Sequence, residues 1–154
     1  MKRYSHNPII EPIGKHVWES SLVFNAAVFA TNDRVHILYR AMGTDNVSRI
    51  GLASSSDGYN IDERLPLPVF SPANEIECQG CEDPRLSLFG NSLVMAYTAF
   101  GNHYQHQVYQ IATTSINKDD FVARKWHWGE RILAFPGIHI KMQCCFRRSS
   151  TVTM

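Results

Sequence analysis

"VHILYRA" at residues 35–41 and "LVMAYTA" at residues 93–99 are two copies of one pattern. Aligning them matches Tyr39 with Tyr97 and Ala41 with Ala99, an offset of 58 residues (39 to 97). Both segments are short and rich in β-branched and aromatic residues, which is typical of strands. The repeat therefore predicts two structural units of the same kind.

The repeat extends along the chain into the neighbouring segments. "GLASSSDGY" at 51–59 and "QIATTSINKDDF" at 110–121 each lead from an apolar run into a Ser/Thr-rich turn. We expect a fourth strand at the end of each copy, in "LPLPVF" (65–70) and "ERILAF" (130–135). Four antiparallel strands per copy are the unit of a β-propeller blade. The sequence thus predicts an all-β fold that contains about two four-stranded antiparallel blades.

Composition limits the classes of function. The chain has 154 residues, of which 44% are hydrophobic, enough for one globular core. Its formal net charge is +1 and no basic run exceeds two residues, so we expect no nucleic-acid partner. The first residues lack the apolar core of a secretory signal, and no apolar stretch is long enough to cross a bilayer. We therefore expect a cytoplasmic protein without a membrane partner, whose four cysteines are thiols.

Polar residues at the start of a blade's first strand face the axial pocket of a propeller. At the 58-residue offset, Asp83 in "GCEDPRL" aligns with Asn25 in "VFNAAVF", and Arg40 at the end of "ILYRA" can reach the same pocket. A carboxylate, an amide and a guanidinium, with Tyr39, Trp18 and Tyr97 offering ring faces, are groups that recognise sugars. These residues are the predicted sugar site.

Two further arginines are candidate substrate-binding residues. Arg85 follows Asp83 by two positions, which places it on the same face of a strand, where it orients the acid or is structural. Arg49, like Arg40, binds substrate or is a solvated strand end that pairs with Asp45 or Glu82. "CQGC" at 78–81 is a lone C-x-x-C without a second pair at zinc-ribbon spacing, so we expect no metal site.

The same segments resemble a known family. "NPII", "VFNAAVF", "ILYRA", "SRIGLASSSDG" and above all "GCEDPRL" are similar to glycoside hydrolase family 130, over about residues 6–139. This family contains mannoside phosphorylases and related β-mannosidases with a five-bladed propeller, of which the chain resembles the N-terminal part.

The resemblance implies a mechanism. Asp83 matches the single catalytic aspartate of inverting β-mannoside phosphorolysis, while Asn25 and Arg40 match positions that hold the mannosyl ring. The expected substrates are a β-1,4-mannoside, such as mannosylglucose or a mannooligosaccharide, and inorganic phosphate, with no cofactor. Asp83 delivers its proton to the glycosidic oxygen through the mannosyl 3-hydroxyl, and phosphate attacks the anomeric carbon from the opposite face. One carboxylate suffices because phosphate is already a nucleophile.

The resemblance stops at His139, which divides the chain into a propeller portion (1–139) and an atypical tail (140–154). One nucleotide string encodes the tail, "IKMQCCFRRSSTVTM", and, when a G precedes it, "DKNAVLFPEKFNGND", which is typical of the family. The tail is therefore predicted to arise from a one-base deletion. Resequencing the locus tests this, because an in-frame read through codon 139 as printed contradicts it.

Two blades lack the phosphate ligands that the resemblance assigns to later blades. We therefore expect phosphorolysis to be weak or absent, and open blade edges to favour association of copies into a homo-oligomer. A non-catalytic carbohydrate-binding or assembly module is the alternative function. A hydrolytic β-mannosidase relative, in which water replaces phosphate, is the third.

Overall fold

The computed structural model describes residues 4–103, 106–136 and 138, and most of its regular structure is β-strand. We call residues 17–64 unit one. A short 3₁₀ turn, η1 (Val17–Glu19), precedes three antiparallel strands, β1 (Leu22–Ala30), β2 (Val35–Met42) and β3 (Ser48–Ser55). A two-residue strand, β4 (Glu63–Arg64), pairs with the end of β3.

Residues 75–133 form unit two, which repeats this order. The 3₁₀ turn η2 (Glu75–Glu77) is followed by three long antiparallel strands, β5 (Gly80–Phe89), β6 (Ser92–His103) and β7 (His106–Asn117). A one-turn helix, α1 (Lys118–Val122), leads toward the short β8 (Ile132–Leu133), which pairs with β7. Each unit thus contains three longer antiparallel strands and a two-residue strand that pairs with the third of them.

The predicted fourth strands are shorter than expected. Residues 65–70 form no strand. The residues that pair with β3 are instead those of β4, just before this segment, and within the segment only Phe70 makes a bridge to β3, at Ile50. Pro66 and Pro68 explain this error, because proline lacks the N–H that a strand donates. β8 does lie within the predicted segment 130–135, but it contains two residues.

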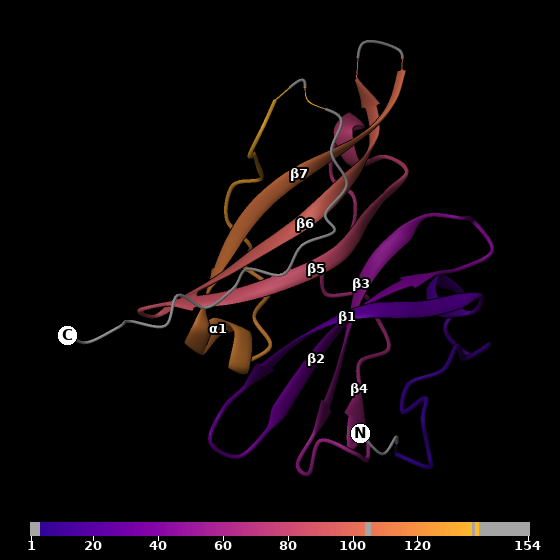
Figure 1. The fold of residues 1–154 in the computed structure, drawn as a ribbon, viewed down its shortest axis with the longest axis vertical. Helices are drawn as coiled ribbons and strands as arrows, with labels where there is room; N and C mark the ends of the chain where they lie inside the picture. Colours follow the sequence, from indigo (N-terminus) through magenta and orange to yellow (C-terminus); the bar gives the residue numbers. More distant parts are fainter. Residues whose placement is uncertain (1–3, 104–105, 137, 139–154) are drawn as a thin grey trace.

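A single parallel bridge between Ser48 and Gly80 joins the two units into one mixed eight-stranded sheet, whose path begins at β1 and ends at β8. Gly80 permits this junction, because a Cβ there would lie 2.6 Å from the Cβ of Ser48 and its φ is +154°. Figure 1 shows β5, β6 and β7 running side by side, with β1 to β4 in a separate group.

The main core lies between the two units. Leu38, Ile50 and Leu52 of unit one cluster with Leu93 and Met95 of unit two, and all five are buried. At the outer end, Phe121 of α1 makes edge contacts with the rings of Phe29 and His36 at the β1–β2 hairpin. The packed interface fixes the position of β1 beside β5, which brings their first halves together.

Both first strands are interrupted at the same place. β1 carries a bulge between Phe24 and Ala27, and β5 carries one between Glu82 and Arg85. The bulged residues Asn25 and Asp83 have φ values of +47° and +52°. Asn and Asp tolerate this left-handed conformation better than other non-glycine residues. The local geometry therefore explains why these residue types occupy equivalent positions.

No helix within the described ranges has the length and hydropathy needed to span a bilayer. Residues 139–154, which include the tail predicted to be out of frame, lie outside the described residues.

Candidate functional site

The bulges of β1 and β5 meet at the junction of the two units. The side-chain amide Nδ2 of Asn25 donates a 2.8 Å hydrogen bond to Oδ1 of Asp83. Asp83 is buried, with 5% of its surface exposed, whereas Asn25 is exposed. The repeat offset predicted that these two residues lie side by side, and in the structure they are hydrogen-bonded to each other.

Arg40 reaches the same carboxylate from β2. Its Nη1 donates to Oδ1 of Asp83 at 3.2 Å, and its Nη2 donates to Oε1 of Glu82. Its Nε donates to Oγ of Ser48 at 3.0 Å, and its guanidinium carbon lies 4.5 Å from the centre of the Phe24 ring. The guanidinium is therefore held by two carboxylates, by the Ser48 hydroxyl and by the Phe24 ring.

Both protein donors to Asp83 converge on the same oxygen. Oδ1 accepts from Asn25 and Arg40, while Oδ2 has no hydrogen-bond partner among the described residues. A carboxylate fixed by one oxygen keeps the other available to donate or accept a proton. The arrangement can thus bind a hydroxyl group and exchange a proton with it.

The other two predicted arginines lie elsewhere. Arg49 donates to Oδ2 of Asp45 at 2.8 Å and to the carbonyl of Val47, which is the ion pair that the sequence offered as an alternative. Nη1 of Arg85 donates to the carbonyl of Pro84 at 2.7 Å. Arg85 and Asp83 are separated by the irregularity in β5, so the regular strand alternation that predicted a common face for them does not hold there.

The two tyrosines do not serve as ring faces in an axial pocket. Tyr39 and Tyr97 are buried, and their hydroxyls donate to Glu19 at 2.8 Å and to Glu77. Burial and these carboxylates raise the pKa of Tyr39 and of Tyr97 far above the usual range. The tyrosines are part of the structure around the site.

Sequence reasoning missed the buried glutamates. Arg64 pairs with Glu19 at 2.6 Å, and Arg131 pairs with Glu77, so that each unit has a Glu–Tyr–Arg cluster. A signal was present, because Glu19 and Glu77 are also 58 positions apart. Extending the repeat upstream of the first strands would have found them.

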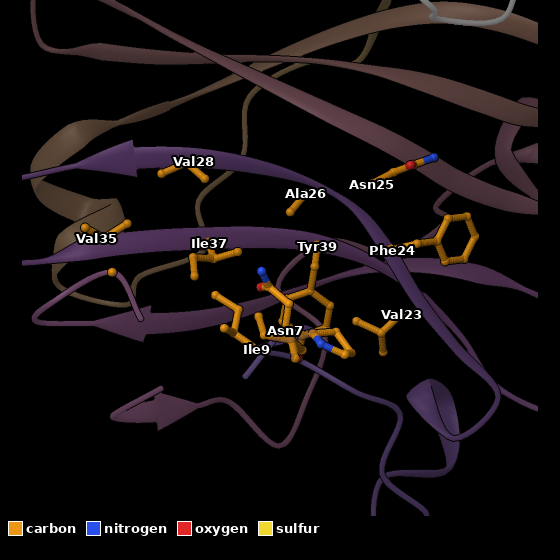
Figure 2. A pocket seen from close by; sticks show the side chains of 13 residues that line it. Asn7, Ile9, Val23, Phe24, Asn25, Ala26, Val28, Val35, Ile37 and Tyr39 are labelled. Atoms are coloured by element: carbon orange, nitrogen blue, oxygen red, sulfur yellow. The ribbon is translucent and has the colours of Figure 1, made fainter. Parts of the chain in front are cut away.

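A cavity of about 570 Å³ lies along β1 and β2 of unit one. It is lined by side chains of β1 and β2 and by the segment before η1, among them Ile9, Val28 and Ile37. Figure 2 shows that the side chain of Asn25 points away from Ile9, Ile37 and Tyr39. Phe24 and Asn25 also line this mostly apolar cavity, whereas Asp83 and Arg40 do not, so the cavity borders the polar site without including its carboxylate.

The two cysteines of "CQGC" lie in different surroundings. Cys81 is buried in β5, where desolvation raises the pKa of its thiol, and Cys78 follows η2. Within the described part of the chain, no three His, Cys, Asp or Glu side chains are arranged to hold a metal ion.

The fold and the site define a β-sheet protein in which a carboxylate is paired with a guanidinium. Comparison with known proteins identifies its family. The model of glycoside hydrolase family 130, described as β-1,4-mannooligosaccharide phosphorylase, matches residues 1–127. The chain therefore belongs to glycoside hydrolase family 130.

Three relatives show the extent of this similarity. The chain is 36% identical to a 1,2-β-oligomannan phosphorylase from Thermoanaerobacter sp. (strain X514), over 79% of this chain and 43% of the relative. It is 40% identical to a β-1,2-mannobiose phosphorylase from the same strain, over 66% of this chain and 37% of the relative. A crystal structure of a glycosyl hydrolase from Bacteroides ovatus superposes with a TM-score of 0.72 and 30% identity, over 88% of this chain and 41% of that protein. The chain thus spans less than half the length of each of these proteins.

Proposed function

We propose that units one and two are two blades of a five-bladed β-propeller. The support is the repeated order of a 3₁₀ turn, a bulged first strand and three further strands, together with the similarity to longer family members. In this arrangement the bulges of β1 and β5 lie beside the propeller axis, where ligands of propellers bind.

We propose further that Asp83, Asn25 and Arg40 form the mannosyl-binding side of a β-mannoside phosphorylase active site. The observation that carries this proposal is that donors from unit one, Asn25 and Arg40, both bind Oδ1 of the Asp83 carboxylate in unit two. Protonated Asp83 acts as the general acid through Oδ2. Its proton moves to the mannosyl 3-hydroxyl, and the proton of that hydroxyl moves to the glycosidic oxygen as the bond from the anomeric carbon breaks. A phosphate oxygen forms the new bond to that carbon from the opposite face, which yields mannose 1-phosphate with inversion.

The linkage that we propose is β-1,2. The sequence led us to expect a β-1,4-mannoside, which agrees with the description of the family model. The two curated relatives, at 36% and 40% identity, are instead named for β-1,2-linked substrates. We therefore expect β-1,2-mannobiose to bind more tightly than β-1,4-mannobiose.

We propose that turnover by this chain is weak. Arginine and lysine side chains form strong charge-assisted hydrogen bonds to phosphate, and among the described residues Arg40 is the only arginine with a hydrogen bond to Asp83. Arg49 and Arg85 stay candidates for binding substrate outside the immediate contacts of Asp83. Association of copies, which would bring further residues to the site, also stays a prediction that light scattering tests.

Incubation of the purified chain with each mannobiose and phosphate tests the proposal. Binding of β-1,2-mannobiose is measured by calorimetry, and release of mannose 1-phosphate by an enzymatic assay. We expect Asp83→Asn to abolish any release, while Asp120→Asn, a substitution far from the site on α1, leaves it unchanged. Release that survives Asp83→Asn contradicts the catalytic role, and unchanged sugar affinity with no turnover in either protein supports the non-catalytic binding module.

A further inference from the structure

Glu82 is a buried carboxylate that the proposed reaction does not use. It precedes Asp83 in β5 and has 3% of its surface exposed. Its Oε1 accepts from Nη2 of Arg40 and from Oγ of Ser48 at 3.3 Å. An ionised group at such a position is costly to bury without partners, so its place between Arg40 and Ser48 requires an explanation.

The three nitrogen atoms of the Arg40 guanidinium each donate to a different residue. Nη2 binds Glu82, Nε binds Ser48, and only Nη1 binds Asp83. An arginine without such competitors commonly binds a carboxylate through two parallel hydrogen bonds. Here that geometry would place a guanidinium donor on both oxygens of Asp83, so that neither oxygen would be free of a protein donor.

Equivalent positions of the two units hold Arg40 from two sides. Residue 24 of unit one and residue 82 of unit two are 58 positions apart and lie just before the bulged residue of their strands. Phe24 supplies a ring 4.5 Å from the guanidinium carbon, and Glu82 supplies a charged acceptor. The ring and the carboxylate together restrict both the position and the rotation of the guanidinium.

We propose that Glu82 is a positioning residue, which holds Arg40 so that it contacts one oxygen of Asp83 and leaves the other open to the sugar hydroxyl. This inference rests on the proposed function of Asp83. Glu82 itself does not touch the substrate, and it acts through the orientation of Arg40.

Nuclear magnetic resonance of the ¹⁵N-labelled full chain tests the proposal directly. In the native protein we expect Arg40 to give a resolved Nε–H signal and separate Nη signals, because its rotation is hindered. Glu82→Gln should merge the Nη signals and weaken binding of β-1,2-mannobiose about tenfold, the effect of losing one hydrogen bond to a charged group. Glu82→Asp, which keeps the charge, should restore most of both properties.

Two further variants keep the test decisive. Glu130→Gln removes the same charge from an exposed position and should change neither the Arg40 signals nor the affinity. If Glu82→Gln does not fold, Ser48→Ala removes the neutral part of the same support and should broaden the Arg40 signals.

The outcomes separate this inference from the proposed function. Unchanged Arg40 signals and affinity in a folded Glu82→Gln or Ser48→Ala protein overturn the positioning role while leaving Asp83 as the acid. Arg40 signals that respond as expected in a chain that does not bind the mannobiose instead contradict the proposed function and leave only a structural role for Glu82.

Discussion

Units one and two have the same backbone plan but different chemistry. Each has a 3₁₀ turn that ends in a buried glutamate, a first strand bulged at a residue with positive φ, and a buried tyrosine on the second strand. Each also has a glycine after the second-strand repeat, Gly43 or Gly101, where a Cβ would lie within 2.3 Å of a carbonyl oxygen of the preceding 3₁₀ turn. The shared residues are those that hold this turn against the sheet.

The differences that form the site lie around the bulge. Unit one has Asn25 and Arg40 where unit two has Asp83 and Thr98, and the paired residues before the bulges are Phe24 and Glu82. The repeated scaffold therefore brings an amide and a guanidinium from one unit to a carboxylate of the other. The site depends on the two units being alike in backbone and unlike in side chain.

Removing the shared glutamates should have the largest effect on stability. We expect Glu77→Ala to lower the free energy of unfolding by about 3 kcal/mol, because it leaves Arg131 and the Tyr97 hydroxyl without their buried acceptor. Glu19→Ala should cost a similar amount through Arg64 and Tyr39. Urea denaturation measures both, with Glu75→Ala on the exposed side of η2 as the control. A cost below about 1 kcal/mol for either variant would show that the clusters are not equivalent supports.

Making the two bulges chemically alike should have an intermediate effect. Asn25→Asp keeps a residue type that tolerates positive φ but places a second carboxylate against Asp83, at the site of a 2.8 Å hydrogen bond. Repulsion raises the pKa of the introduced carboxyl, so the folded state binds more protons than the unfolded state above about pH 4. We expect a loss of about 2 kcal/mol at pH 7.5 that shrinks as the pH falls toward 4.

Denaturation of Asn25→Asp at the two pH values measures this effect. Asn25→Gly serves as its control, because it also permits positive φ and removes the hydrogen bond without adding charge. A deficit of the same size at both pH values, or one shared by the glycine variant, would contradict the predicted contact between the bulges.

His36 in unit one corresponds to Val94 in unit two, and we expect this difference to have the smallest effect on stability of the three. Burial lowers the pKa of His36, with Arg124 and Arg34 adding to the effect and Asp33 and Glu63 opposing it. The lowered pKa keeps His36 neutral in the folded state, so the stability it contributes is present above pH 6.5 and is lost as the pH falls below that value. We expect about 1 kcal/mol less stability at pH 5.5 than at pH 7.5 from this residue. His36→Val should remove that part of the difference, and an unchanged pH dependence would contradict the assignment.

Strand positions were predictable because alternating apolar residues and turn signals are local. The contact between Asn25 and Asp83 followed from the repeat, since equivalent residues of neighbouring units meet. The bulges were not visible in the alternation, which is why the face predicted for Arg85 rested on a wrong premise. The buried roles of Tyr39 and Tyr97 depend on Glu19 and Glu77, which lie outside the strands. Pairing of Arg40 with Glu82 was one of the alternatives that the sequence offered, but its geometry required the structure.

Titration of the ¹⁵N-labelled chain with β-1,2-mannobiose tests the joint site of the two units most directly. We predict that the side-chain amide signal of Asn25 and the guanidinium signals of Arg40 shift together and saturably, and that Asp83→Asn greatly reduces this response. Sugar-dependent shifts confined to Ile9, Val28 and Ile37 around the apolar cavity, or no shifts at Asn25 and Arg40, would contradict the account.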